Sequence, residues 1–102
     1  MIIEHGLMPV QPGREEEFID ALALALPIIN AAQGCHGAEI RRGIENPSQF
    51  LLLVKWDSVE DHMAYRNSPQ FEQWRTLTHP FYVGKAGVDF FITHFEEPVH
   101  SN

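Results

Sequence analysis

The chain has 102 residues, 44% of them hydrophobic, which leaves room for one compact domain with one core. Fourteen acidic against seven basic side chains give a formal net charge of −7, which repels nucleic-acid phosphates and anionic membranes. This balance excludes a nucleic-acid-binding protein and a protein that attaches to a membrane surface.

The first predicted elements are a strand and the start of a helix. Residues 2–10 mix Ile, Leu, Met and Val with single polar residues, and Pro12-Gly13 follows, which predicts a strand that ends in a turn. Residues 15–17 are all glutamate, and negative charge is favourable at the positive end of a helix dipole. A helix is therefore expected to begin directly after the turn.

The apolar residues of this helix recur at intervals of three and four, which places them on one buried face: Phe18, Leu22, Leu26 and Ile29. Pro27 lacks a backbone N–H and crowds the preceding turn. We therefore expect the helix to bend or break near residues 23–26 and to end by Gly34.

Two extended segments follow, residues 37–45 and 49–57, joined by the turn formers Asn46-Pro47-Ser48. This pattern predicts an antiparallel hairpin. Residues 50–54 are apolar on both faces, so this strand is expected to be buried on both sides. With helices on one face of the sheet, we expect a second subunit to cover the other face.

The next segment predicts two short helices, each beginning at a serine cap. Ser58 precedes the first, and Ser68-Pro69 begins the second, since serine caps a helix and proline fits its first turn. The inward face of the first helix is expected to hold Val59, His62, Met63 and Arg66. That of the second is expected to hold Phe71, Trp74, Leu77 or Thr78, and Phe81.

Residues 88–95 alternate as a last strand, and residues 96–102 are expected to be a frayed C-terminal tail. The order is β-α-β-β-α-β, with the second helical segment in two pieces. We therefore predict one α+β domain over residues 1–95, a ferredoxin-like sandwich with an antiparallel sheet.

Metal and nucleophile chemistry have little support in the sequence. The six histidines show no HxH, HxxH or HExxH spacing, so no metal site is expected. Cys35 is the one cysteine; it cannot close an intrachain disulfide and is read as a small buried residue rather than a thiolate. No apolar run approaches a membrane span and no secretory signal is present at the start, so we expect a cytoplasmic protein.

The segment from Trp56 to Tyr82 is rich in aromatic residues and histidines on or beside the predicted helices. A cavity between these helices and the sheet would suit a flat aromatic molecule, although such a stripe can also be ordinary core packing. His62 is either a buried imidazole satisfied by a neighbour or a base in the cavity. Glu4 would orient it if its side chain lies on the helix side.

Several segments together resemble the antibiotic biosynthesis monooxygenase (ABM) domain over nearly the whole chain. They are Val10 to Phe18, Gly34-Cys35-His36-Gly37, Phe50 to Trp56 with Ser58, and Ser68-Pro69-Gln70-Phe71. The resemblance implies a ferredoxin-like monomer that pairs through its sheet into a dimeric α/β barrel. It also implies a pocket between sheet and helices, and oxygenation of anthrone or quinol substrates without flavin, haem or metal.

The haem-degrading branch of the same superfamily uses an Asn, a Trp and a His, and this chain has Gly6, Tyr65 and Arg75 at those places. Haem degradation is therefore not expected. Many other members have a histidine where this chain has Tyr65, whereas its own histidine stands one turn earlier, at His62.

Our first hypothesis is a cofactor-independent monooxygenase that acts on a small hydroxylated aromatic. His62 is the predicted base, and Tyr65 and Arg75 are predicted donors of hydrogen bonds. The predicted substrate-binding residues are Glu4, Trp56, Phe71, Trp74, His79, Phe81 and Tyr82. The second hypothesis is a homodimer that binds a small hydrophobic ligand without turnover, and the third is a structural dimer whose own side chains fill the pocket.

Overall fold

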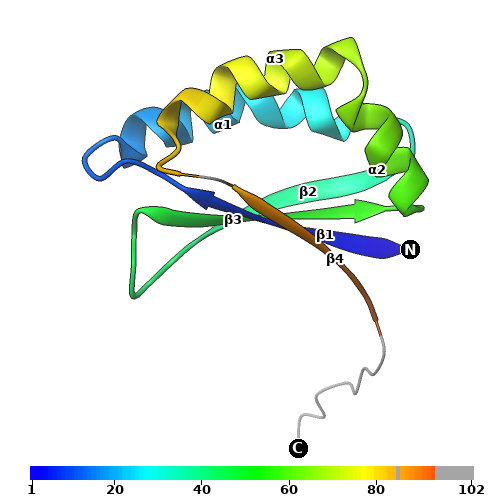
Figure 1. Cartoon of the computed structure of the whole chain (residues 1–102), viewed down its shortest axis with the longest axis horizontal. Coiled ribbons are helices and arrows are strands. Elements are labelled where there is room, and N and C mark those ends of the chain that lie inside the picture. The colour runs from blue at the N-terminus through cyan, green and yellow to red at the C-terminus, as the bar shows by residue number, and fades with distance from the viewer. Residues whose placement is uncertain (85, 94–102) are drawn as a thin grey trace, which may run out of the picture.

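The computed structural model describes residues 1–84 and 86–93 (Figure 1). In chain order its elements are β1 (Ile2–Pro9), α1 (Glu15–Asn30), β2 (Cys35–Arg42), β3 (Gln49–Trp56), α2 (Val59–Arg66), α3 (Pro69–Thr78), the 3-10 turn η1 (His79–Phe81) and β4 (Gly87–Ile92). The predicted β-α-β-β-α-β order is confirmed. The predicted strand end at residues 94 and 95 and the predicted tail lie outside the described residues.

The four strands form one antiparallel sheet in the order β2-β3-β1-β4. All three helices lie on one face of this sheet, and no described element covers the other face (Figure 1). This is the predicted ferredoxin-like sandwich. The uncovered face is called the open face below.

The central strands divide their side chains between the two faces. On β3 the residues that face the helices are buried: Phe50, Leu52, Val54 and Trp56. They pack against the inner face of α1, where Phe18, Leu22, Ala25 and Ile29 are buried as well. Leu51 and Leu53 alternate with the buried set on β3 and lie half-buried on the open face.

Helix α1 does not break at Pro27. It runs to Asn30, and the backbone N–H of Ala31 donates to the Pro27 carbonyl oxygen. Pro27 and Ala23, the residue whose carbonyl loses its intrahelical donor, are both exposed, so water can satisfy that carbonyl.

The inward face of α2 differs from the prediction. His62 and Tyr65 are its buried residues, whereas Val59 and Met63 are exposed. Both buried rings pack against the indole of Trp56, with centroid distances of 5.6 and 5.8 Å. Contact with this large side chain therefore decides which face of the short helix turns inward.

Helix α3 agrees better with its predicted pattern. Trp74 and Thr78 are buried, and Phe71, Leu77 and Phe81 are half-buried. The predicted caps are also present, since the hydroxyl oxygens of Ser58 and Ser68 accept hydrogen bonds from the backbone N–H groups of Asp61 and Phe71.

The turn after α1 makes a glycine indispensable. Gly34 has φ +82°, and a Cβ there would lie 2.5 Å from Cγ and 2.8 Å from Cβ of Asp61. Gly13 has φ +93°, but an added Cβ there would have no atom within 4 Å. A substitution at Gly13 would therefore cost only backbone strain, without a steric clash. We expect Gly13→Ala to lower the free energy of unfolding by about 1–2 kcal/mol, and Gly34→Ala by roughly 1–3 kcal/mol more.

Urea unfolding of the two variants checks this prediction. An equal loss in both would mean that Asp61 moves aside at no cost.

Candidate functional site

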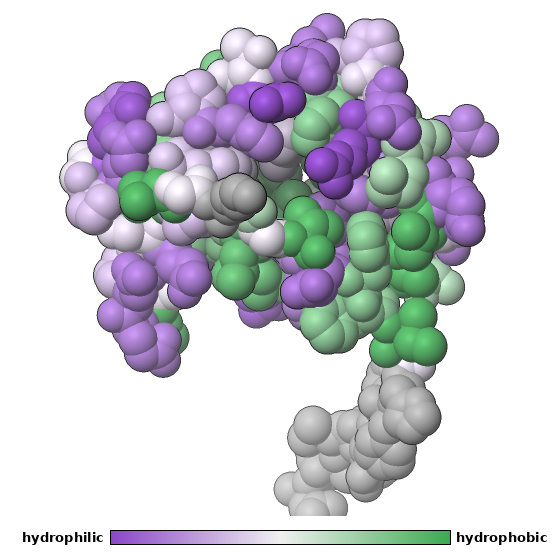
Figure 2. Space-filling model, viewed as in Figure 1, coloured by the Kyte–Doolittle hydropathy of each residue, from purple (hydrophilic) through white to green (hydrophobic). Residues whose placement is uncertain are grey.

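A cavity of about 240 Å³ lies between the helices and the strands β1 and β4. The surface is hollowed on this side of the molecule (Figure 2). The residues that line it include Glu4, Gly6, Met8, Leu52, His62, Phe71, Trp74, His79, Tyr82 and Val88. Apolar and aromatic side chains thus surround a few polar groups, which is the usual composition of a small-molecule pocket.

A buried carboxylate stands in this cavity. Glu4 is only 4% exposed, because its position on β1 turns it toward the helices opposite Val54. The indole N–H of Trp56 donates to Glu4 Oε1 at 2.9 Å. Glu4 Oε2 lies 3.8 Å from the place where a Cβ on Gly6 would be, which is an ordinary contact distance, so only a longer side chain at this position would crowd the oxygen. The indole therefore fixes the carboxylate from one side.

His62 lies beside the same carboxylate without a hydrogen bond to it. Its Nε2 is 3.6 Å from Glu4 Oε1, close enough for an ion pair once the imidazole is protonated but too long for a hydrogen bond. Its Nδ1 is buried and has no partner among the described residues. The rings of Trp56 and Phe90 pack edge-on against the imidazole, with centroid distances of 5.6 and 4.8 Å. The imidazole is thus held by packing, with its Nε2 beside the Glu4 carboxylate and its Nδ1 without a partner among the described residues.

The structure brings together six of the predicted site residues around one cavity: Glu4, His62, Phe71, Trp74, His79 and Tyr82. Trp56 lies behind them as the donor to Glu4.

The other three predicted residues lie elsewhere. The Tyr65 side chain lines a different cavity, and Arg75 is exposed on α3. Phe81 packs on Phe18 at 5.6 Å, with the Arg14 guanidinium over its ring.

Several residues that line the cavity were not among the site residues predicted from the sequence. Gly6 and Met8 follow Glu4 at intervals of two along β1, so the alternation of a strand already places them on its face. Arg66 stands four residues after His62 and was predicted on the same helix face, although not as a site residue, and it contributes a cation to the lining.

Burial shifts the pKa of two residues that line the cavity. It raises the pKa of Tyr82 to about 12, so this hydroxyl remains a hydrogen-bond donor at neutral pH. It also lowers the pKa of His79, and the nearby Arg75 guanidinium lowers it further. The cavity therefore combines a carboxylate, a neutral imidazole at His79 and a phenol that donates.

The described residues hold neither a cluster of metal-ligating side chains nor a membrane-spanning helix. Over residues 1–84 and 86–93, no three or more His, Cys, Asp or Glu side chains gather as they would around a metal ion. No helix in this part of the chain has the length and apolar character needed to cross a membrane.

Comparison with known proteins identifies the family. The family model described as "Antibiotic biosynthesis monooxygenase", ABM, matches residues 1–77. The chain belongs to the ABM family. The Bacillus subtilis protein YczJ, which is uncharacterised, is 34% identical over 92 residues, covering 89% of this chain and 97% of YczJ.

Solved structures agree with this assignment. A Bordetella bronchiseptica protein named for the antibiotic biosynthesis monooxygenases has a TM-score of 0.88 and 36% identity, covering 92% of this chain and 97% of that one. A similarly named protein from Nitrosomonas europaea has a TM-score of 0.80 over 93% of this chain and all of its own, at 15% identity. At that identity the likeness shows the shared ABM fold alone.

Proposed function

We propose that this ABM protein oxidises a small hydroxylated aromatic, of the quinol type, with molecular oxygen. The observation that carries the proposal is the buried contact of Glu4 with Trp56 and His62 in an aromatic-lined cavity. The monooxygenase names of similar proteins support the same reaction class.

The proposed reaction starts with proton removal. His62 takes a phenolic proton, and the adjacent Glu4 carboxylate stabilises the imidazolium that results. The Tyr82 hydroxyl and the Arg66 guanidinium line the same cavity and can stabilise the phenolate oxygens. The walls formed by Phe71 and Trp74 keep water away from the electron-rich anion.

The anion then transfers electrons to oxygen. One atom of O₂ replaces the hydrogen of a ring C–H as a C–O bond, and the other leaves as water. The quinol supplies all four electrons and ends as the hydroxylated quinone, so no further reductant is needed.

The size of the cavity favours a small substrate. Its volume of about 240 Å³ is below the roughly 300–1,000 Å³ of typical small-molecule pockets. We therefore infer that a one-ring or two-ring quinol fits better than a three-ring anthrone.

We further propose that the protein works as a homodimer joined through the open face. Ile3, Leu7, Leu51, Leu53 and Phe91 make the centre of this face largely apolar, with the His5 imidazole among them, and no described element covers it. Charged residues lie toward its edges, among them Glu39, Arg41 and Lys55. An apolar centre with a polar rim is typical of an interface between subunits.

Oxygen uptake tests the proposed reaction. Chelator-treated protein with 1,4-naphthoquinol should consume oxygen faster than the quinol alone, and ¹⁸O₂ should label the product at one ring position. Naphthoquinol that is bound and recovered unchanged would instead mean a ligand-binding protein.

Filling the cavity supplies a matched pair of variants. A Cβ on Gly6 meets Leu52 only at ordinary contact distances of 3.5 and 3.7 Å, so Gly6→Ala should keep most of the oxidation rate. The longer side chain of Gly6→Leu should enter the cavity beside Glu4 and raise the KM for naphthoquinol at least tenfold. Equal KM values in the two variants would place the substrate elsewhere.

A further inference from the structure

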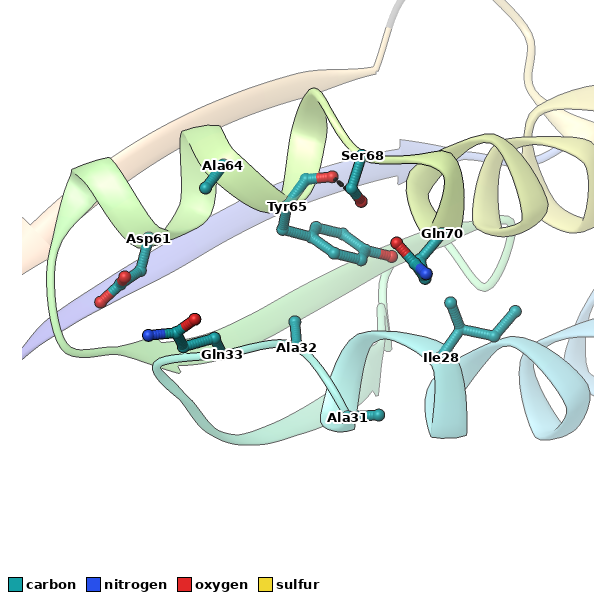
Figure 3. A pocket seen from close by; sticks show the side chains of 9 residues that line it. All are labelled: Ile28, Ala31, Ala32, Gln33, Asp61, Ala64, Tyr65, Ser68 and Gln70. Carbon is teal, nitrogen blue, oxygen red and sulfur yellow. Dashed lines mark hydrogen bonds between the residues drawn. The ribbon is translucent and has the colours of Figure 1, made fainter.

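A second cavity, of about 440 Å³, lies between the helices, and its lining comes from the helices and the turn after α1. It opens between the end of α1 with the turn that follows, α2, and the start of α3 (Figure 3). None of its lining residues lines the candidate site. Apart from the Tyr65 ring, the apolar part of its lining comes from two helices and the turn, namely Ile28, Ala31, Ala32 and Ala64.

The Tyr65 hydroxyl is the unusual group of this cavity. Tyr65 is 6% exposed, and its hydroxyl is buried without a hydrogen-bond partner among the described residues. The ring packs against Trp56 at 5.8 Å and edge-on against Phe71 at 5.6 Å, so it cannot swing away without losing both contacts. Figure 3 shows the hydroxyl pointing across the opening toward Gln70.

The hydroxyl acts as a donor. Burial raises the pKa of Tyr65 far above its ordinary value, so the O–H stays protonated at any physiological pH. Buried hydroxyls in proteins are nearly always hydrogen-bonded, which makes an unpaired one the mark of an absent partner. The partner that fits must offer an acceptor atom.

The charge of the cavity restricts the ligand further. Asp61 is the one charged side chain among its described lining residues, and Ser58 Oγ donates to its Oδ2 at 3.2 Å. A carboxylate or phosphate would therefore meet only a like charge. Gln33 and Gln70 add amide groups that can both donate and accept.

We propose that this cavity binds a small, flat, uncharged molecule that carries a primary carboxamide. The exposed Gln70 side chain, toward which the buried hydroxyl points, turns aside, and the carbonyl oxygen of the ligand then accepts from the Tyr65 hydroxyl. The amide N–H groups face Asp61 and the glutamines, and the flat body lies against the alanines. The volume is within the roughly 300–1,000 Å³ of small-molecule sites. The proposal does not depend on whether the first cavity oxidises a substrate.

A titration with benzamide, followed by ¹H–¹⁵N NMR on the full chain, tests this inference. Benzamide should shift the backbone signals of Ala32 and Ala64, and Tyr65→Phe should weaken that binding at least tenfold while the ring keeps its packing. Tyr82→Phe removes a hydroxyl from the other cavity and should leave the affinity at Ala32 and Ala64 unchanged. Benzoate has the same shape with a negative charge and should cause no shift at these residues.

Three results of the titration would overturn the proposal, in addition to a complete absence of binding. They are shifts confined to Gly6 and Leu52 in the first cavity, equal benzamide affinity in Tyr65→Phe and the unchanged chain, and benzoate binding as tightly as benzamide. The absence of any shift at millimolar benzamide would overturn it as well.

Discussion

Replacing His62 with glutamine should lower the kcat of quinol oxidation by about 100-fold or more, since a positioned general base typically contributes 10²–10⁴-fold. Glutamine has a similar volume and can still contact Glu4, but it cannot take up a proton at neutral pH. The KM should change little, because the walls of the cavity are retained. Stopped-flow oxygen consumption with naphthoquinol measures both constants.

Met63→Gln is the matched control for this variant. Met63 is the next residue on the same helix and is 41% exposed, so glutamine there tests the introduced side chain without touching the cavity. Its kcat should equal that of the unchanged chain. Full activity in His62→Gln would remove this imidazole from the proposed mechanism and leave Glu4 and His79 as the remaining bases of the cavity.

The fold was largely predictable because local signals agree with one another along the chain. Strand alternation, the serine caps at Ser58 and Ser68 and the turn formers at 46–48 each act over a few residues. The face that α2 turns inward was not predictable in this way. It depends on Trp56, which comes from a strand and packs against both His62 and Tyr65.

The candidate site shows the same division. Glu4 was expected to orient His62 if its side chain lay on the helix side, and the structure places the two side chains next to each other. The indole of Trp56 as the donor to Glu4, the space left by Gly6 and the outward position of Arg75 depend on register and helix rotation. The spacing of residues within one element cannot predict these three features, because each of them follows from contacts between elements.

Leu53→Asp should convert the proposed dimer into a monomer. Leu53 lies on the open face, opposite His5 of β1 and Glu39 of β2. In a sheet-to-sheet dimer the new carboxylate would lose its hydration in both copies, beside the like charge of Glu39. An uncompensated buried charge costs about 3–5 kcal/mol. A net cost of only about 3 kcal/mol for the two copies together, after any compensation by His5, already corresponds to a dimer at least a hundredfold weaker. Sedimentation velocity over a range of concentrations measures this change.

Leu24→Asp is the control for this experiment, because it makes the same substitution at a residue that is 67% exposed on α1, away from the sheet. It should leave the dimer intact. A dimer that survives Leu53→Asp would mean that the open face is not the interface.

Strand β1 connects the proposed interface with the proposed site. Its residues Ile3, His5 and Leu7 lie on the open face, whereas Glu4 and Gly6, which alternate with them, face the cavity. Pairing through the open face would therefore hold the strand that carries the buried carboxylate.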